Sequence, residues 1–302
     1  MATLIVLMPQ ILRLFAFWLI FFPALLSGQQ QKISKRTPLP AVLEEISGMT
    51  ILPNGDLWLL NDSHNPPDLF KFDLGGQKIL KTIHLPVPNI DWEDLTSDSL
   101  GNLYLGDFGN NYNRRQDLRI LLYNPDTGIL DSILFEYIDQ TSFPPARKEE
   151  WNYNCEAFIF FKDSLHLFSK NTFKGNFFTK HYVIPAKPGH YTAALRDSVL
   201  LKNRVVTGAA ISRDKKTLAL TGYIVGKKWG FLPFTHASAM LFTGFRGSQF
   251  WGGQQRWQSL PKFLFAKQFE SITPWNDVQW LVANEKRRPQ HQSIWRIRGG
   301  RN

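Results

Sequence analysis

The sequence predicts an all-β fold and, within that class, a β-propeller of five blades. One hairpin pattern recurs five times along the 302 residues. Its apolar runs are short and nearly continuous, which favours strands buried on both faces over helices. The length also suits about five units of four strands each, the composition of a propeller blade.

The first 28 residues form a segment of their own. Their only charge is Arg13, and the apolar stretch Leu14–Leu26 is followed by Ser27 and Gly28. This stretch is shorter than the roughly 20 residues that span a bilayer, so it predicts a cleaved signal peptide, with a membrane anchor as the alternative. We therefore expect a signal peptide at 1–28, one mature domain at 29–302, and a secreted or periplasmic protein without stable membrane insertion.

The repeat is defined by two apolar runs around a polar turn. In each unit fourteen positions separate the first residue from a polar or small residue that closes the second run. Successive units start 46, 63, 52 and 62 residues apart, which leaves room for two further strands and loops. The five units begin at Ser47, Glu93, Glu156, Gly208 and Glu270.

The two ends of the chain are expected to close the ring. Each unit after the first follows a candidate outer strand. After the fifth hairpin the chain has one more candidate strand, Ser293–Arg298, so the fifth blade lacks its fourth strand. The segment QKISKRT at residues 31–37 can supply the missing strand, which would remove two exposed sheet edges. A sixth blade inside one of the long intervals is the alternative.

Composition limits the chemistry. Cys155 is the only cysteine, so the chain forms no internal disulfide and no thiolate metal cluster. The formal charge is +10, and the chain after Glu285 is basic, which suits either a solvated edge or contact with phosphates, acidic glycans or an anionic surface. We expect a monomer that binds a small molecule, and export argues against nucleic acid as its partner.

Acidic residues are expected at one mouth of the ring. The two ends of an antiparallel hairpin lie at the same sheet edge, so the first residues of the five units should form one layer. Three buried glutamates repel one another unless they hold a cation, share protons or pair with a lysine. Calcium accepts carboxylate, hydroxyl and carbonyl oxygens, and the layer offers no histidine to zinc. The predicted metal ligands are Ser47, Glu93, Glu156 and Glu270, with a carbonyl near Thr207; the alternative is a polar plug neutralised by Lys170.

Several short motifs carry a resemblance. The segments NDSHN, DWEDL, LYLGDFGNN, NCEAF, VTGAAIS, QFESI and ANE resemble exported bacterial propellers described as SdiA-regulated or esterase-like phytase-like proteins. The order Ser, Glu, Glu, small, Glu is also similar to the soluble calcium-activated nucleotidases, or apyrases, which are five-bladed and hold one axial calcium. That resemblance implies calcium ligands at Ser47, Glu93, Glu156 and Glu270, and it departs at Gly208, where the nucleotidases have a serine.

Two classes of function remain open. One is a binding protein whose acidic mouth holds a cation and a small, phosphorylated or glycan-like ligand. The other is a calcium-dependent phosphohydrolase. In that second class Asp62, Asp107 and Glu285 are the candidate bases, and Lys170 would stabilise developing negative charge.

Overall fold

The computed structural model describes residues 35–170, 178–201, 204–228, 232–260, 268–287 and 290–299. In these residues the fold is all-β, apart from single 3-10 turns at Ala41–Leu43, Lys148–Glu150 and Phe250–Gly252. The predicted signal peptide lies outside the described residues. No helix among the described residues has the length and apolar character needed to cross a membrane.

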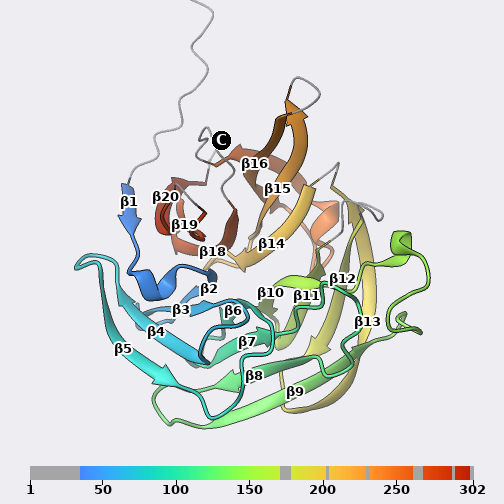
Figure 1. The fold of residues 1–302 in the computed structure, drawn as a ribbon, viewed down its shortest axis with the longest axis horizontal. Coiled ribbons are helices and arrows are strands. Elements are labelled where there is room, and N and C mark those ends of the chain that lie inside the picture. The colour runs from blue at the N-terminus through green and yellow to red at the C-terminus, as the bar shows by residue number, and fades with distance from the viewer. Residues whose placement is uncertain are drawn as a thin grey trace, which may run out of the picture. The chain divides into compact units, whose positions relative to one another are not determined.

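Two of the three four-stranded antiparallel sheets consist of four consecutive strands (Figure 1). In both, the strands follow one another in sequence order, so each sheet is a meander. The first contains β2 (Ile46–Ile51), β3 (Leu57–Asn61), β4 (Asp68–Asp73) and β5 (Lys78–His84). The second contains β14 (Arg204–Ile211), β15 (Thr217–Lys228), β16 (Leu232–Thr243) and β17 (Gln254–Ser259).

A larger sheet of eight strands consists of two such meanders joined side by side. The last strands of the two meanders, β9 and β13, pair in parallel, with Ile133 opposite Gly189. One meander contains β6 (Trp92–Ser97), β7 (Leu103–Asp107), β8 (Arg119–Tyr123) and β9 (Leu130–Tyr137). The other contains β10 (Cys155–Phe161), β11 (Ser164–Ser169), β12 (Phe178–Pro185) and β13 (Gly189–Leu200).

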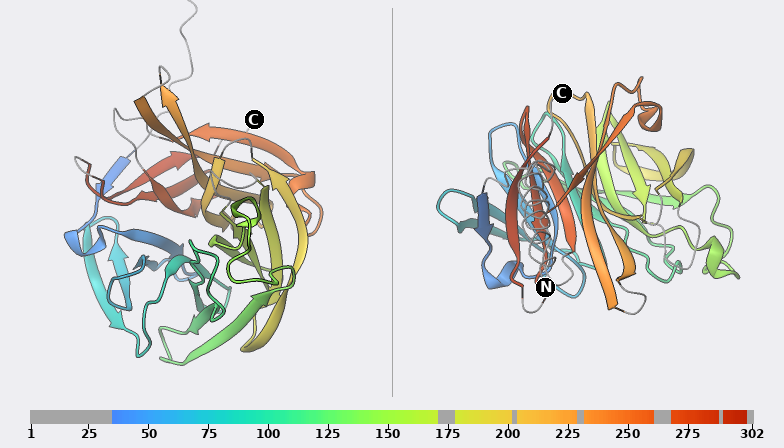
Figure 2. Two further views of the ribbon diagram at one scale, coloured as in Figure 1. Left: turned by 45° about the vertical axis from the view of Figure 1, so that its right-hand side comes forward. Right: turned by 90° about the horizontal axis from the view of Figure 1, so that it is seen from above.

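The last sheet joins the two ends of the described chain. It contains β18 (Phe269–Asn276), β19 (Gln279–Asn284), β20 (Ser293–Arg298) and β1 (Lys35–Pro38). β1 pairs antiparallel with β20, from Lys35 opposite Arg296 to Pro38 opposite Ser293. Figure 2 shows the blue N-terminal strand beside the red C-terminal strands. The predicted pairing of the N-terminal segment with Ser293–Arg298 is therefore confirmed for residues 35–37, and residues 31–34 lie outside the described residues.

The first strands of the five predicted hairpins surround one axis (Figure 1). Among the described residues, β2 contacts β6, β6 contacts β10, β10 contacts β14, β14 contacts β18, and β18 contacts β2. Each of these strands pairs with the next strand in sequence, as the repeat predicts. The starts of the inner strands consequently meet at one end of this ring.

A β-bulge recurs at the start of every inner strand. In β2 the register shifts between Ile46 and Gly48, and the other four inner strands have the same shift. A bulge leaves one residue unpaired and re-aims its side chain, here at equivalent places around the ring. The bulged residues are Ser47, Glu93, Glu156, Thr207 and Glu270.

The fourth position of the predicted layer needs correction, because the bulge falls on Thr207 and not on Gly208. In β14 the residue before the bulge, Val206, pairs with Gly222, sixteen positions away, whereas Ile46 pairs with Asn61, fifteen positions away. The fourth hairpin is thus one residue longer than the first. Gly208 has a packing role, since a Cβ atom there would collide with the backbone carbonyl of Glu270.

Asp94 ties three inner strands together from β6. Its carboxylate accepts hydrogen bonds from the backbone amides of Phe158 in β10 and Ala209 in β14, both at 3.2 Å, and from Leu95 at 2.8 Å. The side chain is fully buried, and this burial raises the pKa of Asp94 well above its usual value. The carboxyl group thus satisfies inner-edge amides that the sheets leave unpaired.

We expect Asp94→Ala to lower the free energy of unfolding by about 2–6 kcal/mol, because it leaves two buried cross-strand amides without an acceptor at about 1–3 kcal/mol each. Asp94→Asn keeps an oxygen of similar shape in place and should cost much less. Urea unfolding of both variants provides the measurement. Equal losses for the two variants would show that the hydrogen bonds to Phe158 and Ala209 contribute little.

Candidate functional site

A cavity of about 110 Å³ lies where the inner strands begin, and all five bulged residues line it. Asp62, Lys170 and Glu285 line it as well. The structure therefore brings together seven of the predicted site residues: Ser47, Asp62, Glu93, Glu156, Lys170, Glu270 and Glu285. We call this space the acidic cavity.

Asp107 is the predicted site residue that does not line this cavity. Its carboxylate is fully buried and forms ion pairs with Arg115 at 3.1 Å and Arg119 at 2.9 Å. It also accepts a hydrogen bond from the backbone amide of Asp91 at 3.1 Å. These contacts give Asp107 a structural place at the end of β7, between the strand and the following turn.

Lys170 places a positive charge inside the acidic cavity. Its ammonium group forms an ion pair with Glu156, and the two side chains are 19% and 5% exposed. Asn154 donates a hydrogen bond to the other oxygen of Glu156 at 2.9 Å. Burial disfavours the charge of Lys170, but the carboxylates around it, Glu156 first among them, raise its pKa well above its ordinary value. Lys170 thus stays charged and neutralises one glutamate.

Two further acids of the cavity, Glu270 and Glu285, have partners other than Lys170. Gln268 donates to Glu270 at 3.1 Å and to the Tyr223 hydroxyl at 3.3 Å. Glu285 accepts from Arg287 at 2.8 Å. Burial raises the pKa of Glu270 to about 8, although the charge of Lys170 opposes the shift.

Three carboxylates converge at this mouth, and the charge of Lys170 acts on one of them, Glu93. Oxygens of Asp62, Asp91 and Glu93 all lie within 4.8 Å of one another, so the three side chains could hold a metal ion. Asp62 follows β3, Asp91 precedes β6, and Glu93 is the bulged residue of β6. We call this set the carboxylate group.

Burial shifts the titration of the carboxylate group upward. It raises the pKa of Asp62 to about 7, against a hydrogen bond from the backbone amide of Ser63 that lowers it. It also raises the pKa of Asp91, and it raises that of Glu93 well above the usual range, with the charges of Glu156, Asp62 and Asp91 adding to the shift. Bringing all three groups together in the ionised form is therefore costly without a neighbouring cation.

Gly109 makes this convergence possible. A Cβ atom at position 109 would collide with the carboxylates of both Asp91 and Glu93. The backbone amide of Gly109 donates to the carbonyl of Asp91 at 3.1 Å, and Arg115 donates to the Gly109 carbonyl at 2.9 Å. The turn after β7 is thereby held against the carboxylate group, and only glycine leaves the acids their space.

The sequence contained a signal for the supporting residues that the prediction did not use. A polar residue stands two positions before the bulged residue in four of the five units: Glu45, Asp91, Asn154 and Gln268. Asn154 and Gln268 donate to the carboxylate two positions later, and Asp91 joins Glu93 in the carboxylate group. No sequence signal of this kind marks Arg287, because it follows the end of the fifth hairpin.

Comparisons with known proteins identify a fold and no family. No protein-family model and no curated protein matches the sequence. A mannose phosphorylase from Leishmania mexicana in complex with phosphate is similar in structure, with a TM-score of 0.51, 10% identity, and coverage of 88% of this chain and 89% of that one. A PQQ-bound aldose sugar dehydrogenase from Streptomyces coelicolor has a TM-score of 0.50 and 10% identity, covering 88% and 97%. Virginiamycin B lyase from Staphylococcus aureus has a TM-score of 0.43 and 12% identity, covering 89% of both chains.

These similarities concern architecture. The similar structures are β-propellers, and this chain is all-β with several four-stranded antiparallel sheets. At 10–12% identity they say nothing about its substrate. The chain is therefore similar in fold to the β-propeller enzymes.

We expect Lys170→Met to lower the free energy of unfolding by about 3–5 kcal/mol, because it leaves Glu156 buried without its partner. The double variant Lys170→Met/Glu156→Gln should recover most of this loss, since no unpaired charge remains. Chemical unfolding of the two single variants and the double variant measures the coupling. Lys286→Met is the control, because its pair with Glu44 is more exposed, at 34% and 44%, and should contribute less than about 1 kcal/mol. Additive effects of the two substitutions would contradict the pairing.

In the presence of a chelator, the free energy of unfolding should fall as pH rises from about 5 to about 8. Asp62 and Glu270 have raised pKa values of about 7 and about 8, so the folded chain holds protons that the unfolded chain has released. Stability is then fully present below the unfolded pKa values and is lost as pH passes the folded ones. Urea titrations across this range, with Glu270→Gln expected to flatten the curve, provide the measurement. Stability that rises over the same range would contradict the shifts.

Proposed function

We propose that the chain is a five-bladed propeller that binds a divalent cation at its acidic mouth. The eight-stranded sheet counts as two blades joined through the parallel contact of β9 with β13. Five bulged inner strands in cyclic contact among the described residues support this count. The proposal includes an exported monomer, with the acidic cavity facing a small-molecule ligand.

The carboxylate group of Asp62, Asp91 and Glu93 is the proposed cation site. Mutual oxygen distances within 4.8 Å suit a single ion bound at about 2.4 Å from each oxygen, the calcium distance. An all-carboxylate donor set favours calcium over zinc. This convergence of three acids is the observation that supports the proposal most strongly.

The cation is placed beside the axis and not among Glu93, Glu156 and Glu270. Lys170 is paired with Glu156, and its positive charge also acts on Glu270. A divalent ion at that place would have to displace the ammonium group. Of the four ligands implied by the nucleotidase resemblance, the proposal therefore keeps Glu93 and assigns Glu156 to the polar plug.

The ligand proposed for this mouth is small and carries phosphate or several hydroxyls. Such a ligand could contact a bound cation on one side and Lys170 on the other, because both border the acidic cavity. Hydrolysis of a phosphoric ester or anhydride is the second candidate function. Glu285, which lines the same cavity and is not a ligand of the proposed cation, is the candidate general base for that reaction.

Phosphate release separates the two functions. Purified protein would be incubated with nucleotides and phosphorylated sugars, with calcium and with chelator. Turnover that requires calcium and is lost in Lys170→Met, but not in Lys286→Met, would support the hydrolase. Calcium-dependent binding of the same compounds without phosphate release supports the binding protein.

We expect calcium to raise the melting temperature of the wild type, because an ion that binds only the folded chain stabilises it by about 2.7 kcal/mol at a hundredfold excess over Kd. Asp91→Asn and Gly109→Ala should abolish the rise, the first by removing a ligand and the second by displacing two. Asp126→Asn, an exposed acid outside the site, is the matched control.

Glu156→Gln distinguishes the two possible places for the ion. With the ion held by the carboxylate group, this variant should keep the calcium-induced rise. A rise that survives in Asp91→Asn and disappears in Glu156→Gln would place the ion on the axis instead. An unchanged wild-type midpoint with calcium and with chelator would overturn the proposal of a calcium site.

A further inference from the structure

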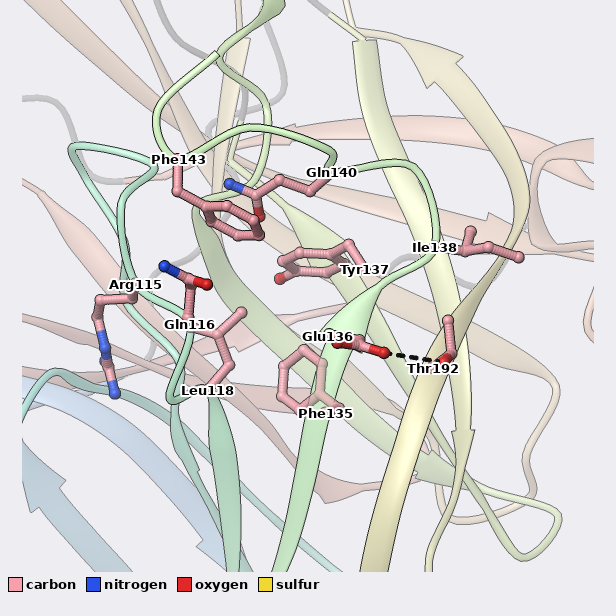
Figure 3. Close-up of a pocket in the computed structure, with 10 residues that line it drawn as sticks. All are labelled: Arg115, Gln116, Leu118, Phe135, Glu136, Tyr137, Ile138, Gln140, Phe143 and Thr192. Carbon is pink, nitrogen blue, oxygen red and sulfur yellow. Dashed lines mark hydrogen bonds between the residues drawn. The ribbon is translucent and has the colours of Figure 1, made fainter.

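A second cavity, of about 330 Å³, shares no lining residue with the acidic cavity. It lies between the loop from β7 to β8, the end of β9 with the segment that follows, and β13 (Figure 3). We call it the side cavity. It is defined here by Gln116, Phe135, Tyr137, Gln140, Phe143 and Thr192.

One part of the side cavity is aromatic. Phe135 and Tyr137 alternate along β9 and are 2% and 4% exposed, and their ring centroids lie 5.5 Å apart at an angle of 82°. Phe143, from the segment after β9, is 38% exposed. Figure 3 shows the three rings on one side of the space, with the Phe143 ring above that of Tyr137. The exposed ring of Phe143 offers an apolar surface to a ligand, and the buried rings of Phe135 and Tyr137 belong to the packed wall of the cavity.

The other part is made of amides with free hydrogen-bonding groups. Gln116 is exposed and forms no side-chain hydrogen bond within the described part of the chain. Gln140 is 7% exposed and donates to the carbonyl of Asn113 at 3.0 Å, which fixes its amide and leaves its oxygen available. The buried hydroxyl of Tyr137 lies beside the Cys155 thiol and has no nitrogen or oxygen partner among the described residues.

Two charged side chains border the side cavity, and ion pairs neutralise one of them. Arg115 bonds to Asp107 at 3.1 Å, to Asp117 at 3.0 Å and to the Gly109 carbonyl at 2.9 Å. Glu136 accepts a hydrogen bond from Thr192 at 3.2 Å, drawn in Figure 3. Arg115 is therefore neutralised, whereas Glu136 keeps its negative charge and can accept hydrogen bonds from hydroxyl groups, so the cavity disfavours an anionic ligand.

We propose that the side cavity binds one neutral sugar ring. A primary amide presents a donor and an acceptor together, which matches the neighbouring hydroxyls of a pyranose. The C–H face of the same ring is apolar and fits against the exposed ring of Phe143. An aromatic surface beside a few polar groups that set orientation is common in small-molecule sites. The site is independent of the cation site proposed above.

Saturation-transfer NMR with the methyl glycosides of glucose, galactose and mannose, and with N-acetylglucosamine, tests this assignment. At least one sugar should bind the full chain, and Gln116→Ala and Phe143→Ala should each weaken binding by about tenfold, the effect of one lost contact. Tyr112→Ala, which removes an exposed aromatic outside the cavity, is the matched control. Chelator and Asp91→Asn should leave sugar binding unchanged, so the cation site and the sugar site can fail separately.

Three results would overturn the assignment. The first is the absence of any sugar signal at millimolar concentration. The second is binding of phenol, used as a planar comparison, with none of the sugars. The third is sugar binding that survives in both Gln116→Ala and Phe143→Ala. Because Gln116 is exposed and contributes no side-chain hydrogen bond, its variant remains an informative test even if Phe143→Ala proves unstable.

Discussion

The repeated β-bulge is the constraint on which the rest of the structure depends. A regular inner strand would send alternate side chains toward its neighbouring sheets, where apolar residues are needed. One extra residue at the start of each inner strand instead turns a polar side chain toward the axis, and this occurs in all five units. The position after the bulge must then be compact or hydrogen-bonded, because the inner strands approach closely there. Gly48 and Gly208 meet this need by having no side chain, and Asp94 meets it by accepting the amides of β10 and β14.

The electrostatic problem at the mouth follows from this geometry. Carboxylates that the ring forces together must be protonated, paired or bound to a cation, and the chain uses more than one of these solutions. Lys170 pairs with Glu156, and Arg287 pairs with Glu285. The acids of the carboxylate group form no ion pair within the described residues, and burial raises their pKa values, although Arg115 acts on Asp91 and Lys170 on Glu93 in the opposite direction. The same mouth thus contains a neutralised plug and an adjacent place where a cation would lower the energy of the folded chain.

The sequence predicted the hairpins, the ring closure and most of the acidic mouth, because each depends on local pattern. Apolar runs around a polar turn recur at nearly constant spacing. The strand pairing agrees with this spacing, since Ile46 pairs with Asn61 at the end of the first hairpin. The misplacement at Gly208 arose because a bulge can shift by one residue without changing the apolar pattern, and Thr207 carried no feature that marked it. The carboxylate group was missed as a unit for a different reason. Its members come from two units of the repeat and from both ends of hairpins, and Gly109 shows its role only when a Cβ atom is placed in three dimensions.

The most direct test of this account is a crystal structure of the protein grown with calcium, with the ion located by anomalous scattering. The account predicts a single strong peak within about 2.4 Å of oxygens from Asp62, Asp91 and Glu93, with Lys170 still paired to Glu156. A peak on the axis among Glu93, Glu156 and Glu270, with the lysine displaced, would contradict it. The absence of any peak at this mouth at saturating calcium would contradict the proposed cation site altogether.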